Sequence, residues 1–339
     1  MNSRRRTLLN IARVLISAGL LAWVISRSGL EDLIEAARDA NLALLAEAYA
    51  LAIAGMFMRT YRWLILLKAA GATVSAWRAL YLYFVGGFFN VFLPTGLGGD
   101  VLRVLEIGPG ASSEQAAATV LVDRLTGFVV LFVMALAALP FSASLLPRGT
   151  AILVGLLAGA VCLGALLLFE GRLLRRLTAW MPDPISLASE GWLGRTYAVI
   201  TGGTGTGGAG TRPAATTGTG AGTGPAATSR AIWGALGVST VYNLSVIWAS
   251  VLVARAFGLQ VSAWHFLSFT PIAVVALLVP ISIGGLGVRE GIYVTLFGQV
   301  GLSAAQATVL SLGVYSLDVF TGLLGGMIYL LAGVLGLRK

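Results

Sequence analysis

Charged residues recur inside the long apolar segments of this 339-residue chain, which is 57% hydrophobic and only 11% charged. Five are basic and five are acidic: Arg59, Arg62, Arg103, Arg124 and Arg289, with Asp100, Glu106, Asp123, Glu290 and Asp318. An unpaired charge at the centre of a membrane costs roughly 2.5 to 3.5 kcal/mol, so these side chains cannot all face lipid. Either they neutralise one another between helices, or some of them line a polar cavity in which arginine binds an anion.

Two of these arginines follow a proline and a pair of glycines. The stretches "LPTGLGGDVLR" (93–103) and "VPISIGGLGVR" (279–289) share the pattern apolar-Pro-x3-Gly-Gly-x3-Arg, with an offset of 186 residues. The matching positions are Pro94 and Pro280, Gly98 and Gly284, Gly99 and Gly285, and Arg103 and Arg289. Each stretch is followed by a serine, a glutamine and the tetrapeptide "ATVL", at 118–121 and 307–310. The sequence therefore predicts an internal repeat.

Each proline and glycine stretch predicts a re-entrant hairpin. Proline removes a backbone donor and ends a helix, and glycine permits a sharp reversal of the chain. The half-helix that emerges has unpaired N–H groups suited to phosphate, and a neighbouring guanidinium can bind two phosphate oxygens. We therefore expect lipid or phosphate contacts from the first hairpin at Arg103. From the second hairpin we expect them at Gly284, Gly285, Gly287 and Arg289.

The two hairpins differ at one informative position, where Asp100 in the first corresponds to Leu286 in the second. Asp100 can cap its own helix, pair with Arg103 or meet a cationic headgroup, and it would repel an anion. The second hairpin lacks this carboxylate, which predicts a free helix N-terminus and a more direct phosphate contact at Arg289.

The remaining charges have two possible roles. Arg59, Arg62 and Arg124 are candidate phosphate ligands, or they extend to the membrane surface and hold helices together. The candidate charge partners or headgroup contacts are Asp100, Asp123, Glu290 and Asp318. For Asp318, a hydrogen bond to a neighbouring helix is favoured over proton transfer.

Apolar runs predict the elements that position these residues, since about 20 helical residues cross a bilayer of roughly 30 Å. We expect an all-α polytopic membrane protein with about six transmembrane helices and two re-entrant hairpins. The helices are expected at 8–25, 42–67, 115–139, 150–169, 231–257 and 303–335, and the hairpins at 79–107 and 264–298. Basic flanks predict cytoplasmic termini in the cytoplasmic or inner membrane. Three crossings separate the hairpins, so they are expected to open to opposite sides as an inverted repeat.

The composition divides the chain into three regions. We expect a first transmembrane half at 1–176, a flexible Thr/Gly-rich cytoplasmic linker at 177–230, and a second transmembrane half at 231–339. The linker matches the glycine pattern of dinucleotide-binding loops, but it lacks the strand, helix and acidic residue that such a loop requires.

Four segments also resemble a known family. They are "RTYRWLILLKAAG" (59–71), "FVGGFFNVFLPTGLGGDVLRV" (84–104), "VDRLTG" (122–127) and "PISIGGLGVREG" (280–291). These segments are similar to the lysylphosphatidylglycerol synthase transmembrane region, also called the flippase-like family. The resemblance covers nearly the whole chain except the linker, and it implies translocation of lipids or lipid-linked precursors between leaflets. The chain has no soluble aminoacyl-transferase domain, so it resembles a stand-alone member.

We therefore expect translocation of an anionic phospholipid or of a polyprenyl-phosphate or aminoacylated precursor. One alternative is an intramembrane transferase that acts on a prenyl-phosphate and uses Asp100, Asp123 or Glu290. Another is a non-transporting scaffold of a lipid or cell-envelope synthesis complex.

The sequence indicates a non-enzymatic protein without a cofactor or metal, because it has no paired-aspartate metal motif and a single histidine, His265. The expected partners are membrane lipids and lipid-synthesis enzymes. Nucleic acid is not expected, despite a net charge of +9, because the basic residues are scattered along the chain.

Overall fold

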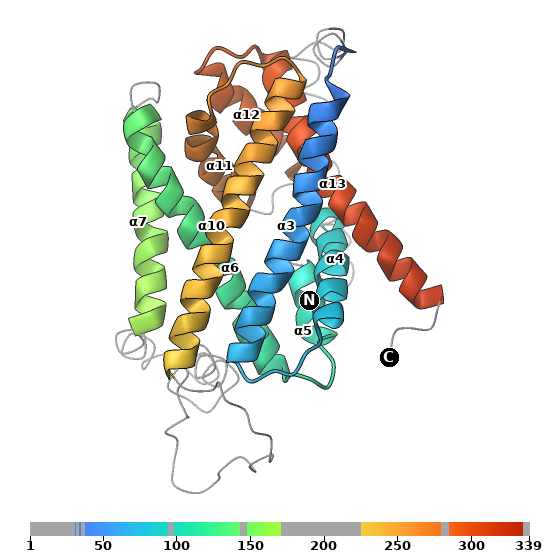
Figure 1. Cartoon of the computed structure of the whole chain (residues 1–339). Helices are drawn as coiled ribbons and strands as arrows, with labels where there is room; N and C mark the ends of the chain where they lie inside the picture. The colour runs from blue at the N-terminus through green and yellow to red at the C-terminus, as the bar shows by residue number, and fades with distance from the viewer. Residues whose placement is uncertain are drawn as a thin grey trace, which may run out of the picture.

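The structure is a computed structural model that describes residues 31, 34, 38–93, 98–142, 148–170, 225–278 and 285–334. In these ranges every regular element is a helix (Figure 1). The helices are α3 (Leu42–Ala69), α4 (Ala76–Phe92), α5 (Gly98–Leu105), α6 (Ser113–Ser142), α7 (Arg148–Glu170), α10 (Pro225–Ala256), α11 (Ala263–Leu278), α12 (Val288–Gly298) and α13 (Ala304–Val334). The predicted all-α class is confirmed.

Four of these helices contain segments long and apolar enough to cross a membrane. The segments are Leu42–Ala69, Ser113–Ala138, Ser229–Ala256 and Ala304–Val334, and each corresponds to a predicted crossing. Helix α7 has 23 residues and occupies the position of the crossing predicted at 150–169. The crossing predicted at 8–25 lies outside the described residues. The chain is a multi-pass membrane protein.

The two predicted hairpins correspond to two pairs of short helices. Helix α4 packs against α5, and α11 packs against α12. The tips of both hairpins, which include Pro94, Pro280 and Gly284, lie outside the described residues. At the start of α5 the backbone passes so close to α4 that a Cβ atom on Gly99 would overlap the carbonyl oxygen of Gly86. Only glycine allows this crossing.

Helices α3 and α10 are antiparallel along the middle of the bundle. The backbone N–H of Asn41, before α3, donates to the carbonyl of Ala256 at the end of α10, with 2.8 Å between the two atoms. In Figure 1 α4 and α5 lie in the lower part of the bundle, whereas α11 and α12 lie in the upper part. Helix α4 packs against α13, and α11 packs against α6. Helices α3 and α10 therefore run in opposite directions, and each half of the chain contains a pair of short helices that packs against a long helix.

The long helix that follows each hairpin begins with the same hydrogen-bonded cap. At the start of α6, Ser112 and Gln115 exchange backbone-to-side-chain hydrogen bonds of 2.8 and 3.2 Å. At the start of α13, Ser303 and Gln306 form the same pair at 3.0 and 3.2 Å. Each cap satisfies two N–H groups that a helix start leaves unpaired. The serine and glutamine that recur in the sequence therefore form the same N-terminal cap on both helices.

A second junction between helices also occurs twice, and it was not predicted from the sequence. The stretches "KAAGATVSAW" (68–77) and "RAFGLQVSAW" (255–264) each join a long helix to the first helix of a hairpin. Gly71 and Gly258 end the long helices with φ of 77° and 69°, a conformation that favours glycine. The shared "VSAW" was the sequence signal for this match.

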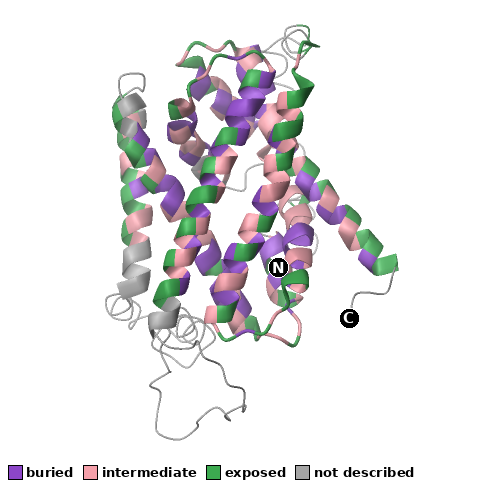
Figure 2. Ribbon diagram, in the orientation of Figure 1, coloured by how far each residue is buried: buried purple, intermediate pink, exposed green. Residues whose placement is uncertain are grey.

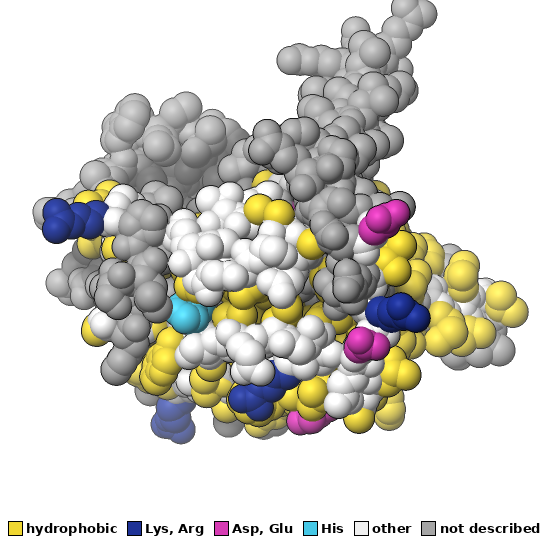
Figure 3. Space-filling model, turned by 90° about the horizontal axis from the view of Figure 1, so that it is seen from above, with side chains coloured by type: hydrophobic (Ala, Val, Ile, Leu, Met, Phe, Trp, Pro, Cys, Tyr) yellow, Lys and Arg dark blue, Asp and Glu magenta, His cyan; other side chains and the backbone are white. Residues whose placement is uncertain are grey.

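Buried residues lie where the helices contact one another (Figure 2), and many large apolar side chains are exposed on the outer faces of the helices. One cluster of buried side chains lies around α10 to α13 and includes Phe266, Phe269 and Phe297. Another lies around α3 and α4 and includes Trp63 and Leu82. On the face seen in Figure 3, the basic side chains lie apart from one another instead of forming one patch.

Helix α10 begins at Pro225, six residues before the predicted start of the second half at 231. Proline is favoured in the first turn of a helix, because its missing N–H has no helical partner there. The first six residues of α10 therefore fall within the region predicted as a linker. The rest of the predicted linker lies outside the described residues.

Candidate functional site

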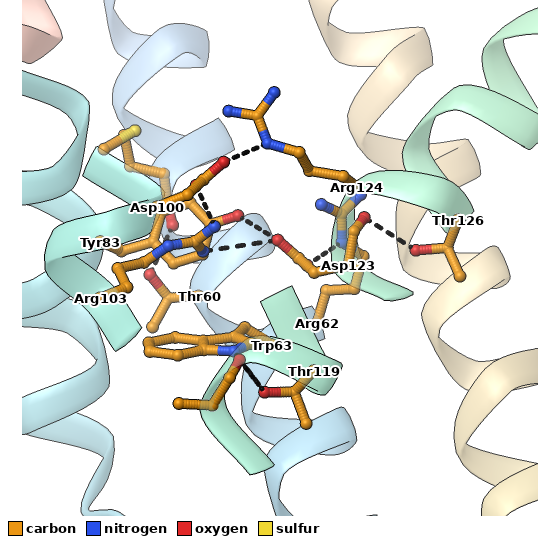
Figure 4. Close-up of polar contacts among 12 residues, drawn as sticks. Thr60, Arg62, Trp63, Tyr83, Asp100, Arg103, Thr119, Asp123, Arg124 and Thr126 are labelled. Atoms are coloured by element: carbon orange, nitrogen blue, oxygen red, sulfur yellow. Dashed lines mark hydrogen bonds and ion pairs between the residues drawn. The ribbon is translucent and has the colours of Figure 1, made fainter. Parts of the chain in front are cut away.

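Five charged side chains from α3, α5 and α6 form what we call the buried charge network (Figure 4). They are Arg62, Asp100, Arg103, Asp123 and Arg124. Arg62 Nε donates to Asp123 Oδ1 at 2.6 Å, and Arg103 Nη2 donates to Asp100 Oδ1 at 2.5 Å. Arg124 pairs with the other oxygen of Asp100, and Arg103 Nη1 lies 3.5 Å from Asp123 Oδ2. The two carboxylates thus bridge three arginines.

Neighbouring polar groups hold the network in place. Tyr83 on α4 donates its hydroxyl to Asp123 Oδ2 at 2.7 Å, and Arg62 donates to the hydroxyl of Ser239 on α10 at 2.9 Å. The network therefore joins α3, α4, α5, α6 and α10. Ser239 and Tyr83 were not expected from the sequence, and a hydroxyl within an apolar segment was their only signal.

Arg103 is enclosed by its neighbours. Its guanidinium carbon lies 4.4 Å from the ring centroid of Tyr83 and 4.9 Å from that of Trp63, and its side chain is 3% exposed. Of the three possibilities for Asp100, the structure shows the pair with Arg103. Arg103 does not line the cavity that lies among α3, α10, α11, α12 and α13. In this structure it therefore binds carboxylates and aromatic rings of its own half.

A cavity of about 170 Å³ lies among α3, α10, α11, α12 and α13. Its polar lining includes Arg59 and Tyr242 from α3 and α10, and Arg289, Tyr293 and Asp318 from α12 and α13. The two halves of the chain therefore contribute basic residues to one space. Arg59 and Arg289, 230 positions apart in the sequence, are brought together only by the tertiary structure.

Arg289 is loosely held in this cavity. Its Nη1 lies 3.3 Å from Asp318 Oδ2, and its guanidinium carbon lies 4.5 Å from the ring centroid of Tyr315. Its Nε is buried and has no hydrogen-bond partner among the described residues. A buried donor without a partner is costly, so this atom is suited to an acceptor from a ligand.

Arg59 is held by aromatic rings. Its guanidinium carbon lies 5.0 Å from the ring centroid of Tyr83 and 5.5 Å from that of Tyr242. Among the described residues it forms no ion pair with a carboxylate. Because Tyr83 also bonds to Asp123, it connects Arg59 in the cavity with the buried charge network.

Comparison with protein families agrees with this architecture. Residues 10–326 match the family described as the lysylphosphatidylglycerol synthase TM region. The chain belongs to this family. No curated protein matched the chain. Membership indicates a lipid-related role in the membrane.

Glu290 of this family member caps its own helix. Its side chain is fully buried, and its Oε2 accepts the backbone N–H of Gly287 at 2.5 Å. The hydroxyl of Ser311 on α13 donates to Oε1 at 3.4 Å. The expectation that α12 has a free N-terminus is therefore wrong, because Glu290 occupies one of its donors. A carboxylate three residues into a helix can turn back to the first N–H.

The glycines before α12 allow this turn of the backbone. Gly285 and Gly287 have φ of 77° and 81°, which other residues rarely adopt. Among the described residues, no group of three or more His, Cys, Asp or Glu side chains is placed to hold a metal ion.

Replacing Glu290 with alanine is expected to destabilise the fold by about 1 to 3 kcal/mol, because the N–H of Gly287 would be buried without an acceptor. Glu290→Gln should lose much less, since an amide oxygen can form the same cap. The midpoint of thermal unfolding in detergent measures both. Equal losses in the two variants would contradict the capping role and indicate that the charge itself is required.

Proposed function

We propose that this protein translocates an anionic phospholipid, or a lipid-linked polyprenyl-phosphate or aminoacylated precursor, between the leaflets of the membrane. The observation that carries the proposal is the cavity in which Arg59 and Arg289 lie without full neutralisation. Guanidinium groups bind phosphate oxygens in pairs, and such bonds are stronger in a site that excludes water. The headgroup would occupy the cavity while the acyl or prenyl chains remain in lipid.

The arrangement of the two halves supports transport. We interpret the matching helices, repeated caps and opposite directions of α3 and α10 as an inverted repeat with two re-entrant hairpins. Transporters with such repeats place the substrate between the halves and expose it alternately to each side. The cavity lies between the halves, as this mechanism requires. We place both chain ends on the cytoplasmic side of the cytoplasmic membrane, as the basic flanks predict.

The buried charge network has a different role in this proposal. Its carboxylates are bonded to arginines and to Tyr83, so they hold α3, α5 and α6 in fixed positions. A general base needs a free position from which to reach its substrate. Asp100 and Asp123 are enclosed by ion pairs and Glu290 caps α12, which favours transport over the intramembrane transferase.

Purified protein in liposomes tests the proposal. The probe is a fluorescent phosphatidylglycerol whose exposure in the outer leaflet is followed by chemical quenching. We expect Arg289→Ala and Arg59→Ala each to slow its transfer by about tenfold to a hundredfold, because each removes charged hydrogen bonds worth about 1.5 to 3 kcal/mol. Arg255→Ala is the matched control, since Arg255 is exposed and lies outside the cavity.

Three results would contradict the proposal. Unchanged transfer in both cavity variants would show that lipid does not pass through this cavity. Formation of a covalent lipid product by the wild-type protein would indicate the transferase. Absence of both transfer and product in the wild type would favour the scaffold that assists lipid-synthesis enzymes.

A further inference from the structure

The ion pairs in the two halves differ in how tightly they are held. Arg62 and Asp123 lie 2.6 Å apart with side chains 5% and 1% exposed. Arg289 and Asp318 lie 3.3 Å apart, and the Asp318 side chain is 59% exposed. The longer contact with an exposed carboxylate is weaker than the short buried pair, because separating the buried pair would leave two uncompensated charges in the interior. Arg289 can therefore exchange its partner at a small cost, and Arg62 cannot.

The guanidinium of Arg289 is only partly occupied by Asp318. One carboxylate oxygen meets Nη1, while the buried Nε has no partner among the described residues. Tyr315 lies over a face of the guanidinium and forms no hydrogen bond with its donors among the described contacts. A guanidinium edge presents parallel donors that match two oxygens of one phosphate. Asp318 bonds to Nη1, so it occupies one of the two donors of the edge formed by Nη1 and Nη2, which is an edge that a phosphate would bind.

The charges around the cavity define which anion can enter. Among the described lining residues the charged groups are Arg59, Arg289 and Asp318, giving a net charge of +1. Glu290 is turned toward Gly287 and Ser311 and does not appear in the lining. A phosphodiester carries one negative charge, so its entry neutralises this space. While Asp318 stays bonded to Arg289, however, its carboxylate repels the same phosphate.

We infer that Asp318 is an internal counter-ion that competes with the lipid phosphate for Arg289. In this structure its carboxylate pairs with Arg289. On binding, the phosphate of the lipid takes the edge formed by Nη1 and Nη2, and Asp318 turns away from Arg289 within the cavity that both residues line. On release, the carboxylate returns to Arg289. This inference rests on the proposed function, and it adds the regulation of affinity at the same site.

Competition of this kind lowers affinity and speeds release. A ligand that must displace an internal partner binds more weakly, because its apparent dissociation constant is the intrinsic constant divided by the fraction of sites that this partner leaves free. A lipid transporter needs moderate affinity, because a headgroup bound too tightly would not leave for the opposite leaflet. Removing the carboxylate should therefore tighten binding while it slows transfer, whereas the loss of Arg289 should weaken binding as it slows transfer.

The test compares Asp318→Asn with the wild-type full chain in detergent and in liposomes. Binding of phosphatidylglycerol is measured by titration, and transfer is measured by quenching of its fluorescent analogue. Asp318→Asn should lower the dissociation constant by about two- to tenfold, the range expected for loss of an exposed ionic competitor, and it should reduce the transfer rate at saturating lipid. Glu47→Gln is the matched control, because it removes one exposed carboxylate of α3 that does not line the cavity.

Each outcome separates this inference from the proposed function. If Arg289→Ala abolishes binding while Asp318→Asn binds as the wild type does, the counter-ion role is overturned and the phosphate site stands. Weaker binding by Asp318→Asn would also overturn it, since the carboxylate would then contact a cationic part of the headgroup. If Arg289→Ala binds normally, the site in the proposed function is wrong, and the counter-ion role fails with it. Equal thermal unfolding of the variants and the wild type excludes a folding defect as the cause.

Discussion

Replacing Asp123 with asparagine is expected to destabilise the protein by about 3 to 5 kcal/mol, the effect of removing one partner from a buried ion pair. Asp123 is 1% exposed and accepts bonds from Arg62 and Tyr83. An amide of the same shape cannot neutralise the guanidinium of Arg62, which would remain charged in the interior. Reversible unfolding in mixed micelles with increasing dodecyl sulfate measures the free-energy change.

Two controls identify the cause of this loss. Asp39→Asn removes an exposed carboxylate before α3 and should leave the free energy of unfolding unchanged. The double variant Arg62→Met with Asp123→Leu removes the charged pair together, and it should be more stable than Asp123→Asn. A loss below about 1 kcal/mol for Asp123→Asn would contradict the assignment of the network as the support for α3 and α6.

Replacing Gly325 with alanine is expected to force α13 away from α4. A Cβ atom at this position would overlap the backbone carbonyl oxygen of Phe84, and backbone cannot move aside as a flexible side chain can. Overpacking at such sites costs about 1 to 3 kcal/mol or more. The result should be a large fall in the midpoint of thermal unfolding, together with loss of lipid transfer, because α13 also carries Asp318 into the cavity.

Gly322→Ala is the matched control on the same helix. A Cβ atom there would lie 3.4 Å from Val91, an ordinary contact, so its effect should be small. Small residues let helices approach closely within a membrane, where the apolar surroundings provide no hydrophobic driving force between them. If Gly325→Ala and Gly322→Ala unfolded at the same temperature, the close crossing of α4 and α13 would be incorrect.

Two arginines at the same position of the repeat thus have different environments. Arg103 lies under Tyr83 and Trp63 and binds carboxylates at short range, whereas Arg289 faces a cavity with one loose partner. Asp100 accounts for part of the difference, since its counterpart Leu286 cannot bind an arginine. One half of the repeat is therefore suited to holding helices together, and the other is suited to exchanging ligands.

The sequence by itself determined the helical elements and most of their ends. Apolar runs of membrane length predict the four long spans, and the "Ser-x-x-Gln" caps begin α6 and α13 where the repeat places them. These features are local: the hydrogen bonds of a helix and its cap join residues within about four positions of one another. The charged residues and the family motifs are also short stretches of sequence, so they could be identified without the structure.

Only the tertiary structure decided which charges meet. Arg62 finds Asp123 across 61 positions and Ser239 across 177, and Arg59 shares a cavity with Arg289 from the other half. Glu290 turned to its own helix, against the expectation of a free N-terminus. Such partners depend on how the helices pack, because two side chains interact at hydrogen-bond range only after several distant segments have come together. The assignment of Arg103 to the fold and of Arg289 to the cavity therefore required the structure.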